Sequence, residues 1–143
     1  MTITLFSADD GNGNVELWST DGTTGRTIRL ADINPGASGS NPANTGSNFD
    51  PDHTPAFAVL NGVAYFSADD GVHGRELWRS DGTAAGTVAV TDFTGSTGGV
   101  PNGYSPNNIL VANNLLFFNG NGPSGFGVYS STGVAGSTPA QSC

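Results

Sequence analysis

The sequence predicts an all-β protein built from about three copies of one unit of four short antiparallel strands. Two observations carry this prediction: a segment of 18 residues that recurs along the chain, and 22 glycines among 143 residues, with many Asn, Ser, Thr and Asp. Gly adopts positive φ angles, and the short polar side chains hydrogen-bond to nearby backbone, so the composition favours tight turns between short strands. No stretch has the periodicity of an amphipathic helix.

The recurring segment defines the unit. It reads FSADDGNGNVELWSTDGT at residues 6–23 and FSADDGVHGRELWRSDGT at residues 66–83, an offset of 60 residues without a gap. A degenerate third copy, FNGNGPSGFGVYSSTG, begins at Phe118. The flanking segments recur as well, so one full unit spans about 50 to 60 residues.

The middle unit shows the expected strands most clearly. Apolar residues alternate with polar or small ones, as in half-buried strands, and Asn61-Gly62 is typical of a two-residue hairpin turn. The four predicted strands are Ala56–Leu60, Val63–Ala68, Arg75–Ser80 and Thr87–Phe93.

Such a four-stranded meander is the building block of a β-propeller. We expect about ten strands in a single domain, residues 1–143, with two of the three units incomplete: the first lacks its first strand and the third lacks its fourth. Incomplete units leave sheet edges open to further pairing. The predicted order is an incomplete unit at 1–36, a loop at 37–54, the complete unit at 55–95, a loop at 96–106, an incomplete unit at 107–138 and a tail at 139–143.

The blocks ELWSTDGT and ELWRSDGT, each preceded by SADDG, resemble the ELWxxDGT-type repeat of large secreted or surface proteins of bacteria. The resemblance covers essentially the whole chain, as two good copies and one weak copy. It implies a propeller-like architecture and an extracellular or cell-surface location, and it implies no activity. The third copy departs from the motif because Gly127, Tyr129 and Thr132 replace its Glu, Trp and Asp.

The charge of the chain restricts its partners. The formal net charge is −8, with four arginines and no lysine. A nucleic-acid-binding surface needs a basic patch, and no stretch is long and apolar enough for a membrane span, so we expect neither partner. An acidic surface suits divalent cations or neutral glycans, although the charge alone would also serve solubility.

Few residues belong to familiar catalytic patterns. His53 and His73 are the only histidines and lack the spacing of a zinc site. Cys143 has no internal disulfide partner; it either cross-links two chains or has no role. Glu16 and Glu76 recur with the unit, whereas a catalytic site seldom repeats in every unit, so we expect no enzyme. For Glu76 we expect contact with an arginine or with backbone amides.

Asp10, Asn12, Asn14 and Glu16 form the clearest candidate metal site. Oxygen ligands at every second position of a glycine-rich turn can converge on a hard cation, so the pattern predicts a calcium site. The second unit does not repeat the pattern. The alternative is a polar hairpin without a metal.

Two further motifs have competing interpretations. Trp18 and Trp78 either pack between units or stack on sugar rings, because indole offers an apolar face and an N–H donor. The pairs Asp21-Gly22 and Asp81-Gly82 predict structural turns, with Asp bonded to its own backbone and Gly in the left-handed conformation.

Two functions remain open at this point. The first is a non-catalytic extracellular module for binding or adhesion, with calcium as a candidate ligand. The second is a structural subunit that completes its units by assembling into a filament or ring. The partners expected are further copies of the chain, other β-rich chains, or glycans.

Overall fold

The computed structural model describes residues 2–42, 57–93, 95–97 and 100–142. Within these residues the protein is all-β, as predicted, with three antiparallel sheets of three, four and four strands and a separate two-stranded hairpin. The described helical structure is a single 3-10 turn, η1 (Thr24–Arg26). No helix in the described ranges is long and apolar enough to cross a membrane.

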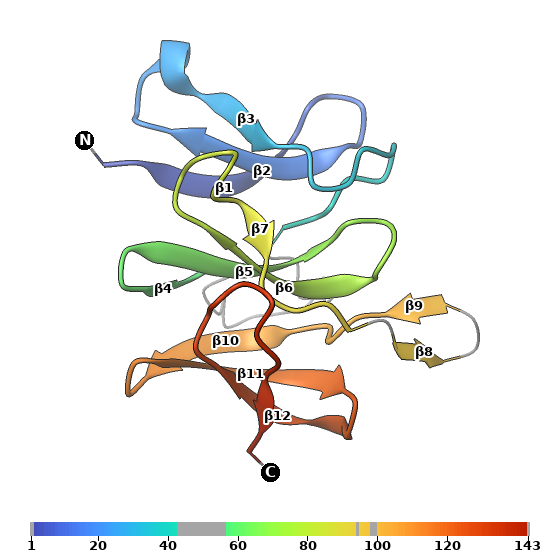
Figure 1. The fold of residues 1–143 in the computed structure, drawn as a ribbon. Helices are drawn as coiled ribbons and strands as arrows, with labels where there is room; N and C mark the ends of the chain where they lie inside the picture. The colour runs from blue at the N-terminus through green and yellow to red at the C-terminus, as the bar shows by residue number, and fades with distance from the viewer. Residues whose placement is uncertain (1, 43–56, 94, 98–99, 143) are drawn as a thin grey trace.

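The strands follow one another along the chain as meanders (Figure 1). The first sheet contains β1 (Thr4–Asp9), β2 (Val15–Thr20) and β3 (Ile28–Ala31). The second sheet contains β4 (Ala58–Leu60), β5 (Val63–Asp69), β6 (Arg75–Ser80) and β7 (Val88–Ala89). The hairpin is formed by β8 (Gly95–Thr97) and β9 (Val100–Asn102), and the third sheet by β10 (Asn107–Ala112), β11 (Leu115–Gly122), β12 (Gly125–Ser131) and β13 (Ala140–Gln141).

The three sheets share one register. Phe66 faces Trp78 across β5 and β6, and Phe6 faces Trp18 in the same way across β1 and β2. In the third sheet Phe118 faces Tyr129, which stands where the motif has tryptophan. Because register decides which residues point to each face of a sheet, equivalent positions of the repeat point the same way in all three units.

The prediction that the third unit lacks its fourth strand is wrong. Ala140 and Gln141 pair with Ser130 and Tyr129, and the Ser142 N–H donates to the Val128 carbonyl at 2.7 Å. Strand pairing uses backbone groups, so two residues with little apolar character can still form it. The residues predicted as a tail therefore include β13.

The fourth strand of the middle unit is shorter than predicted. After β7 the N–H groups of Val90 and Thr91 both donate to the Leu77 carbonyl, at 2.7 and 3.3 Å, which ends the regular ladder. The Thr91 hydroxyl then donates to the buried carboxylate of Glu76. The β8–β9 hairpin lies in the segment predicted as a loop at 96–106.

The three sheets form a stack in which the second sheet lies between the other two (Figure 1). Each interface contains its own buried apolar cluster. The cluster between the first and second sheets includes Leu17, Leu30, Ile33, Phe66 and Ala68. The cluster between the second and third sheets includes Tyr65, Leu77, Leu116, Phe118 and Tyr129.

Both faces of the middle strand β6 are apolar for this reason. Leu77 is fully buried in the cluster with the third sheet, whereas its neighbour Trp78 packs against the cluster with the first sheet. Successive side chains of a strand point to opposite faces, so the Leu-Trp pair serves both interfaces.

Candidate functional site

A buried glutamate fastens the end of the first unit. Glu16, at the start of β2, is fully buried, and its carboxylate accepts four hydrogen bonds. The donors are the N–H groups of Ile33, Asn34 and Ser40, at 3.1, 3.0 and 3.0 Å, and the Ser40 hydroxyl at 2.5 Å. All of them belong to the chain that follows β3, so the carboxylate ties that segment back to its own sheet.

Glu76 repeats this arrangement in the second unit, where its side chain is 2% exposed. Its carboxylate accepts hydrogen bonds from the Thr91 hydroxyl, from the Phe93 N–H at 2.7 Å and from the Tyr104 N–H. Burial raises the pKa of Glu76 to about 7, although these hydrogen bonds lower it in part. Of the two partners expected for Glu76, the structure supplies backbone amides.

A Gly-x-x-Pro segment packs across each glutamate-bearing strand: Gly39–Pro42 in the first unit and Gly103–Pro106 in the second. The glycine is needed for close approach, because a Cβ there would lie 2.4 Å from backbone atoms of Val15 or 2.3 Å from the carbonyl oxygen of Arg75. The third residue of each segment has a φ of 45° or 47°. Its N–H donates to that same Val15 or Arg75 carbonyl, at 3.0 or 2.8 Å.

The second residue of each segment connects two sheets. Ser40 donates its N–H to Glu16 in the first sheet, and its carbonyl accepts the N–H of Asp69 in the second sheet, at 3.0 Å. Tyr104 repeats this link, because its carbonyl accepts the N–H of Asn121 in the third sheet, at 2.7 Å. We call the buried glutamate together with its Gly-x-x-Pro segment the inter-sheet junction.

Sequence reasoning missed the Gly-x-x-Pro half of this junction. The segments GSNP and GYSP fell in stretches predicted as loops, outside the recurring block of 18 residues. Their shared glycine and proline, each following a repeat copy, were the available signal. The third unit has Gly127 in place of the glutamate, so it has no carboxylate at this position.

The structure does not bring the four predicted calcium ligands together. Asp10 accepts the N–H of Asn12 at 2.9 Å within its own turn, and the buried oxygen of Asn14 lies against Gly39 without a hydrogen bond. Glu16 instead directs its carboxylate into the inter-sheet junction. The described residues include no group of three or more His, Cys, Asp or Glu side chains that could hold a metal ion. A calcium site in this turn stays a prediction.

The two tryptophans have different surroundings. Trp18 is partly exposed on the first sheet, and its indole N–H donates to the Ala8 carbonyl at 3.0 Å. Trp78 packs between the first and second sheets, and its buried indole N–H has no hydrogen-bond partner. Stacking on a ligand stays a prediction for both residues.

The aspartates of the DGT turns bond to their own turns. Asp21 and Asp81 each accept the N–H and the hydroxyl of the threonine two residues later, at 2.6 to 3.0 Å. These hydrogen bonds lower the pKa of both carboxyls. Gly22 and Gly82 follow with φ angles of 92° and 91°. The structure thus places all four residues in tight turns.

A small acidic pocket of about 140 Å³ lies beside the second junction and is lined partly by Asp70, His73, Glu76 and Asp92. The Nδ1 of His73 lies 2.5 Å from a carboxylate oxygen of Asp70, and this hydrogen bond raises the pKa of His73. The other oxygen of Asp70 accepts the N–H groups of Val72 and His73. Asp70 and Glu76 are therefore both engaged in holding backbone.

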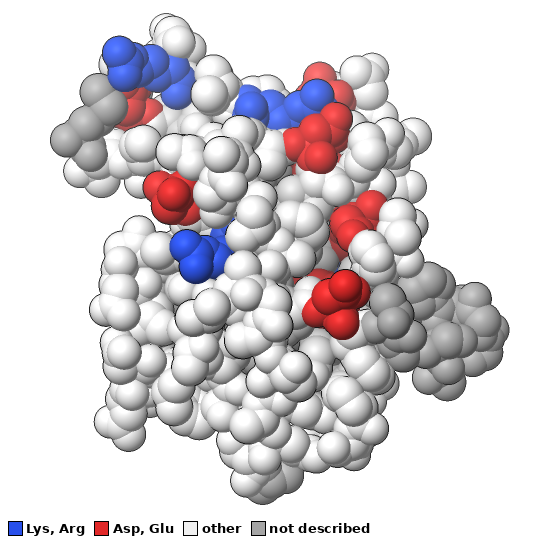
Figure 2. Space-filling view, in the orientation of Figure 1, with Lys and Arg blue, Asp and Glu red and all other residues white. Residues whose placement is uncertain are grey.

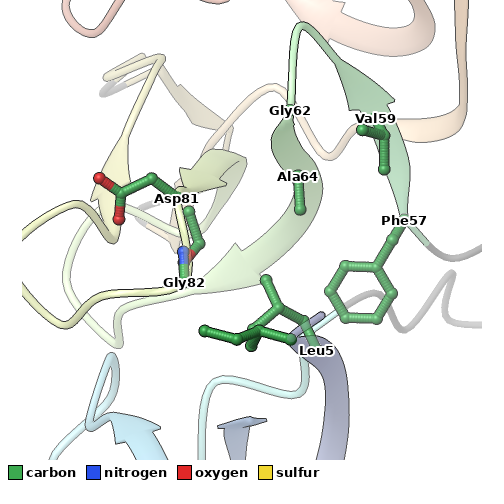
Figure 3. A pocket seen from close by; sticks show the side chains of 9 residues that line it. Leu5, Phe57, Val59, Gly62, Ala64, Asp81 and Gly82 are labelled. Carbon is green, nitrogen blue, oxygen red and sulfur yellow. The ribbon is translucent and has the colours of Figure 1, made fainter. Parts of the chain in front are cut away.

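The largest opening is an apolar groove between the first and second sheets, with a volume of about 410 Å³. Leu5 of β1 lies on one side, and Phe57, Val59 and Ala64 lie on the other (Figure 3). Ile3, which also lines the groove, is 49% exposed, and Val59 is 64% exposed. The remaining lining residues are Gly62, Ser80, Asp81 and Gly82.

Charge is distributed unevenly along the stack. Every charged side chain lies between residues 9 and 92, and residues 93–143 contain no Asp, Glu, Lys or Arg. On the face shown in Figure 2, the charged atoms lie over the first and second sheets, and the region of the third sheet carries none. The third sheet is therefore a neutral end of an acidic protein.

Comparison of the chain with protein-family models, with curated proteins and with solved structures finds no match. The resemblance to the ELWxxDGT-type repeat therefore stays a prediction from the motif.

Proposed function

We propose that the chain is a non-catalytic, extracellular binding module that associates with further β-sheet chains through the two end faces of its stack. The supporting observation is that one packing arrangement occurs twice within the chain, between the first and second sheets and between the second and third. Each interface joins two different faces of the repeat unit. The end sheets present one face of each kind without a partner among the described sheets.

The outer face of the first sheet has the composition of an inner face. Phe6 and Trp18 occupy the repeat positions of Phe66 and Trp78, which pack against the cluster between the first two sheets. Phe66 is fully buried there, whereas Phe6 and Trp18 are partly exposed. This outer face thus suits a surface like the one formed by Leu17, which covers Phe66.

The outer face of the third sheet offers the complementary kind of surface. Val128 occupies the repeat position of Leu77, and the register places Leu110 and Phe126 on the same face. Leu110 is 52% exposed and Phe126 is 76% exposed. Natural sheets often guard against association with charged residues, and this sheet has none.

The two outer faces differ from each other, so their association would be head to tail. Such contacts form rings when the rotation closes and filaments when it does not. Because Gly127 replaces the junction glutamate, a sheet stacked on the third sheet would lack that covalent and hydrogen-bonded connection. This favours a separate chain as the partner at that end.

Two other parts of the proposal rest on separate support. The non-catalytic role is supported by the repeat acids, because Glu16, Glu76, Asp21 and Asp81 all hold backbone groups. The extracellular location rests on the resemblance of the ELW blocks to repeats of secreted and surface proteins.

Sedimentation velocity over a range of concentrations tests the proposal. We expect the mass to rise above the 14.4 kDa of one chain as concentration increases, and Phe126→Asp to suppress that rise. Val72→Asp is the matched control, since Val72 is 64% exposed and lies in the β5–β6 turn, away from both end faces. A species that stays monomeric at every concentration, or equal effects of the two substitutions, would overturn the proposal.

A further inference from the structure

The first sheet has three strands where the second has four, and the difference lies at one edge. In the second sheet β4 pairs with the outer edge of β5, with Ala58 opposite Tyr65 and Leu60 opposite Val63. The repeat offset makes β1 the counterpart of β5. No strand in the described part of the chain pairs with this edge of β1. A sheet edge presents a row of backbone donors and acceptors to an added strand.

The strand β4 shows what this position contributes to the stack. Its Ala58 and Leu60 are 9% and 6% exposed, and both belong to the cluster between the second and third sheets. Its opposite face carries Val59, which points toward the first sheet. The strand therefore fills the space between two sheets with a small and a large apolar side chain at alternate positions.

The groove of about 410 Å³ occupies the corresponding place between the first and second sheets. Ile3 and Leu5 correspond to Val63 and Tyr65, and they form the wall next to the free edge of β1 (Figure 3). Phe57, Val59 and Ala64 form the opposite wall. Where β4 buries its neighbours, the groove leaves Ile3 and Val59 about half exposed or more, at 49% and 64%.

We propose that the outer edge of β1 and this groove form an acceptor site for a β-strand donated by another repeat-containing chain. The donor strand would pair antiparallel with β1 and point a small residue and a leucine into the groove, as Ala58 and Leu60 do in the second sheet. This inference rests on the proposed function for the class of partner, and it adds the site and the sequence that the site accepts.

The polar groups around the groove favour a neutral donor. Asp81 is the only charged residue that lines it, and its carboxylate is engaged by the N–H and the hydroxyl of Thr83. The remaining walls are apolar or small. A charged side chain directed into the groove would lose its hydration without gaining a partner.

The first test uses a peptide as the donor strand. The probe is the capped heptapeptide AFAVLNG, which copies residues 56–62, added to the isotopically labelled chain. We expect saturable changes in the amide NMR signals of Ile3, Leu5 and Ala64. A peptide with aspartate at the Ala58 and Leu60 positions should lose binding by a factor of at least about 10.

Variants of the acceptor separate groove binding from adhesion elsewhere. Ile3→Lys and Val59→Lys change side chains that are already half exposed or more, so both variants should fold and lose the peptide. Val72→Lys changes an equally exposed valine outside the groove and should bind like the parent chain. Equal binding by all three variants would overturn the proposed site.

The second test attaches the donor to the acceptor. Residues 1 and 2 are replaced by FAVLNG, so that the Asn-Gly turn leads into Ile3 as it leads into Val63 in the second sheet. We expect the melting temperature to rise by about 3 °C or more and peptide binding to be lost. The matched insertion FDVDNG should give no such rise.

The outcomes distinguish this inference from the proposed function. Absence of peptide binding together with no thermal gain from FAVLNG overturns the acceptor site, whatever the mass of the chain. If the parent chain self-associates in that case, the end-face proposal stands without the acceptor site. Peptide binding by a chain that stays monomeric supports the acceptor site and counts against the end faces.

Discussion

Ser40 donates both its backbone N–H and its hydroxyl to the buried carboxylate of Glu16, at 3.0 and 2.5 Å. The carbonyl of the same residue accepts a hydrogen bond from Asp69 in the next sheet. One residue therefore links two consecutive sheets, and the glutamate of the ELW block acts as its anchor. The repeated glutamate has a structural explanation that requires no ligand.

We expect Glu16→Ala to destabilise the chain by roughly 3 to 5 kcal/mol, because three backbone N–H groups and a hydroxyl lose their acceptor. Asp32→Ala is the control, since Asp32 forms an exposed ion pair with Arg29 at 3.6 Å, and removal of such a pair costs at most about 1 kcal/mol. Urea unfolding at neutral pH measures both changes. Similar costs for the two variants would contradict the anchoring role of Glu16.

The second anchor gives a prediction about pH. Burial raises the folded-state pKa of Glu76 from 4.5 to about 7, so the folded chain holds this proton more tightly than the unfolded chain. Stability therefore falls as pH rises through that window, by roughly 3 kcal/mol from this group.

The comparison of the parent chain with Glu76→Gln isolates this contribution. The free energy of unfolding of the parent, relative to the variant, should decrease between about pH 5 and about pH 8. Carbon NMR of the carboxyl group should place the titration midpoint near 7. A constant difference in stability across this range, or a midpoint near 4.5, would show that the pKa is not raised.

The Gly-x-x-Pro segment predicts a position that is intolerant of any side chain. A Cβ at Gly103 would lie 2.3 Å from the carbonyl oxygen of Arg75 and 2.6 Å from the carboxylate of Glu76. We expect Gly103→Ala to cost about 1 to 3 kcal/mol through displacement of the segment. Gly25→Ala is the control, because no atom lies within 4 Å of its added Cβ. Thermal unfolding should separate the two variants, and equal melting temperatures would rule out the close packing of Gly103.

The sequence predicted the central strands closely because both of their faces are under constraint. The third predicted strand, Arg75–Ser80, coincides with β6, and Val63–Ala68 differs from β5 by one residue. Alternating side chains that serve two apolar interfaces leave a clear pattern. Short strands such as β13 leave none, because their pairing depends on backbone groups that every residue carries.

The junction was less predictable than the strands for a related reason. Glu16 could be expected to meet backbone amides, but its donor Ser40 lies 24 residues further along the chain. The segments between the glutamates and their Gly-x-x-Pro partners differ in length between the two units. A fixed-offset repeat therefore revealed the acceptor of these hydrogen bonds and concealed the donors.

The placement of Glu16 also changes what is expected of calcium. A cation in the Asp10 turn would have to bind without Glu16, and Asp9 and Asp10 already accept N–H groups of Gly11, Asn12 and Gly13. A ligand that binds only the folded chain raises its melting temperature, so we expect calcium and a chelator to give values within about 1 °C of each other. Asp10→Ala should lower the melting temperature equally in both solutions, through loss of the turn. A calcium-dependent rise that Asp10→Ala abolishes would instead establish a metal site in this turn, with oxygen ligands other than Glu16.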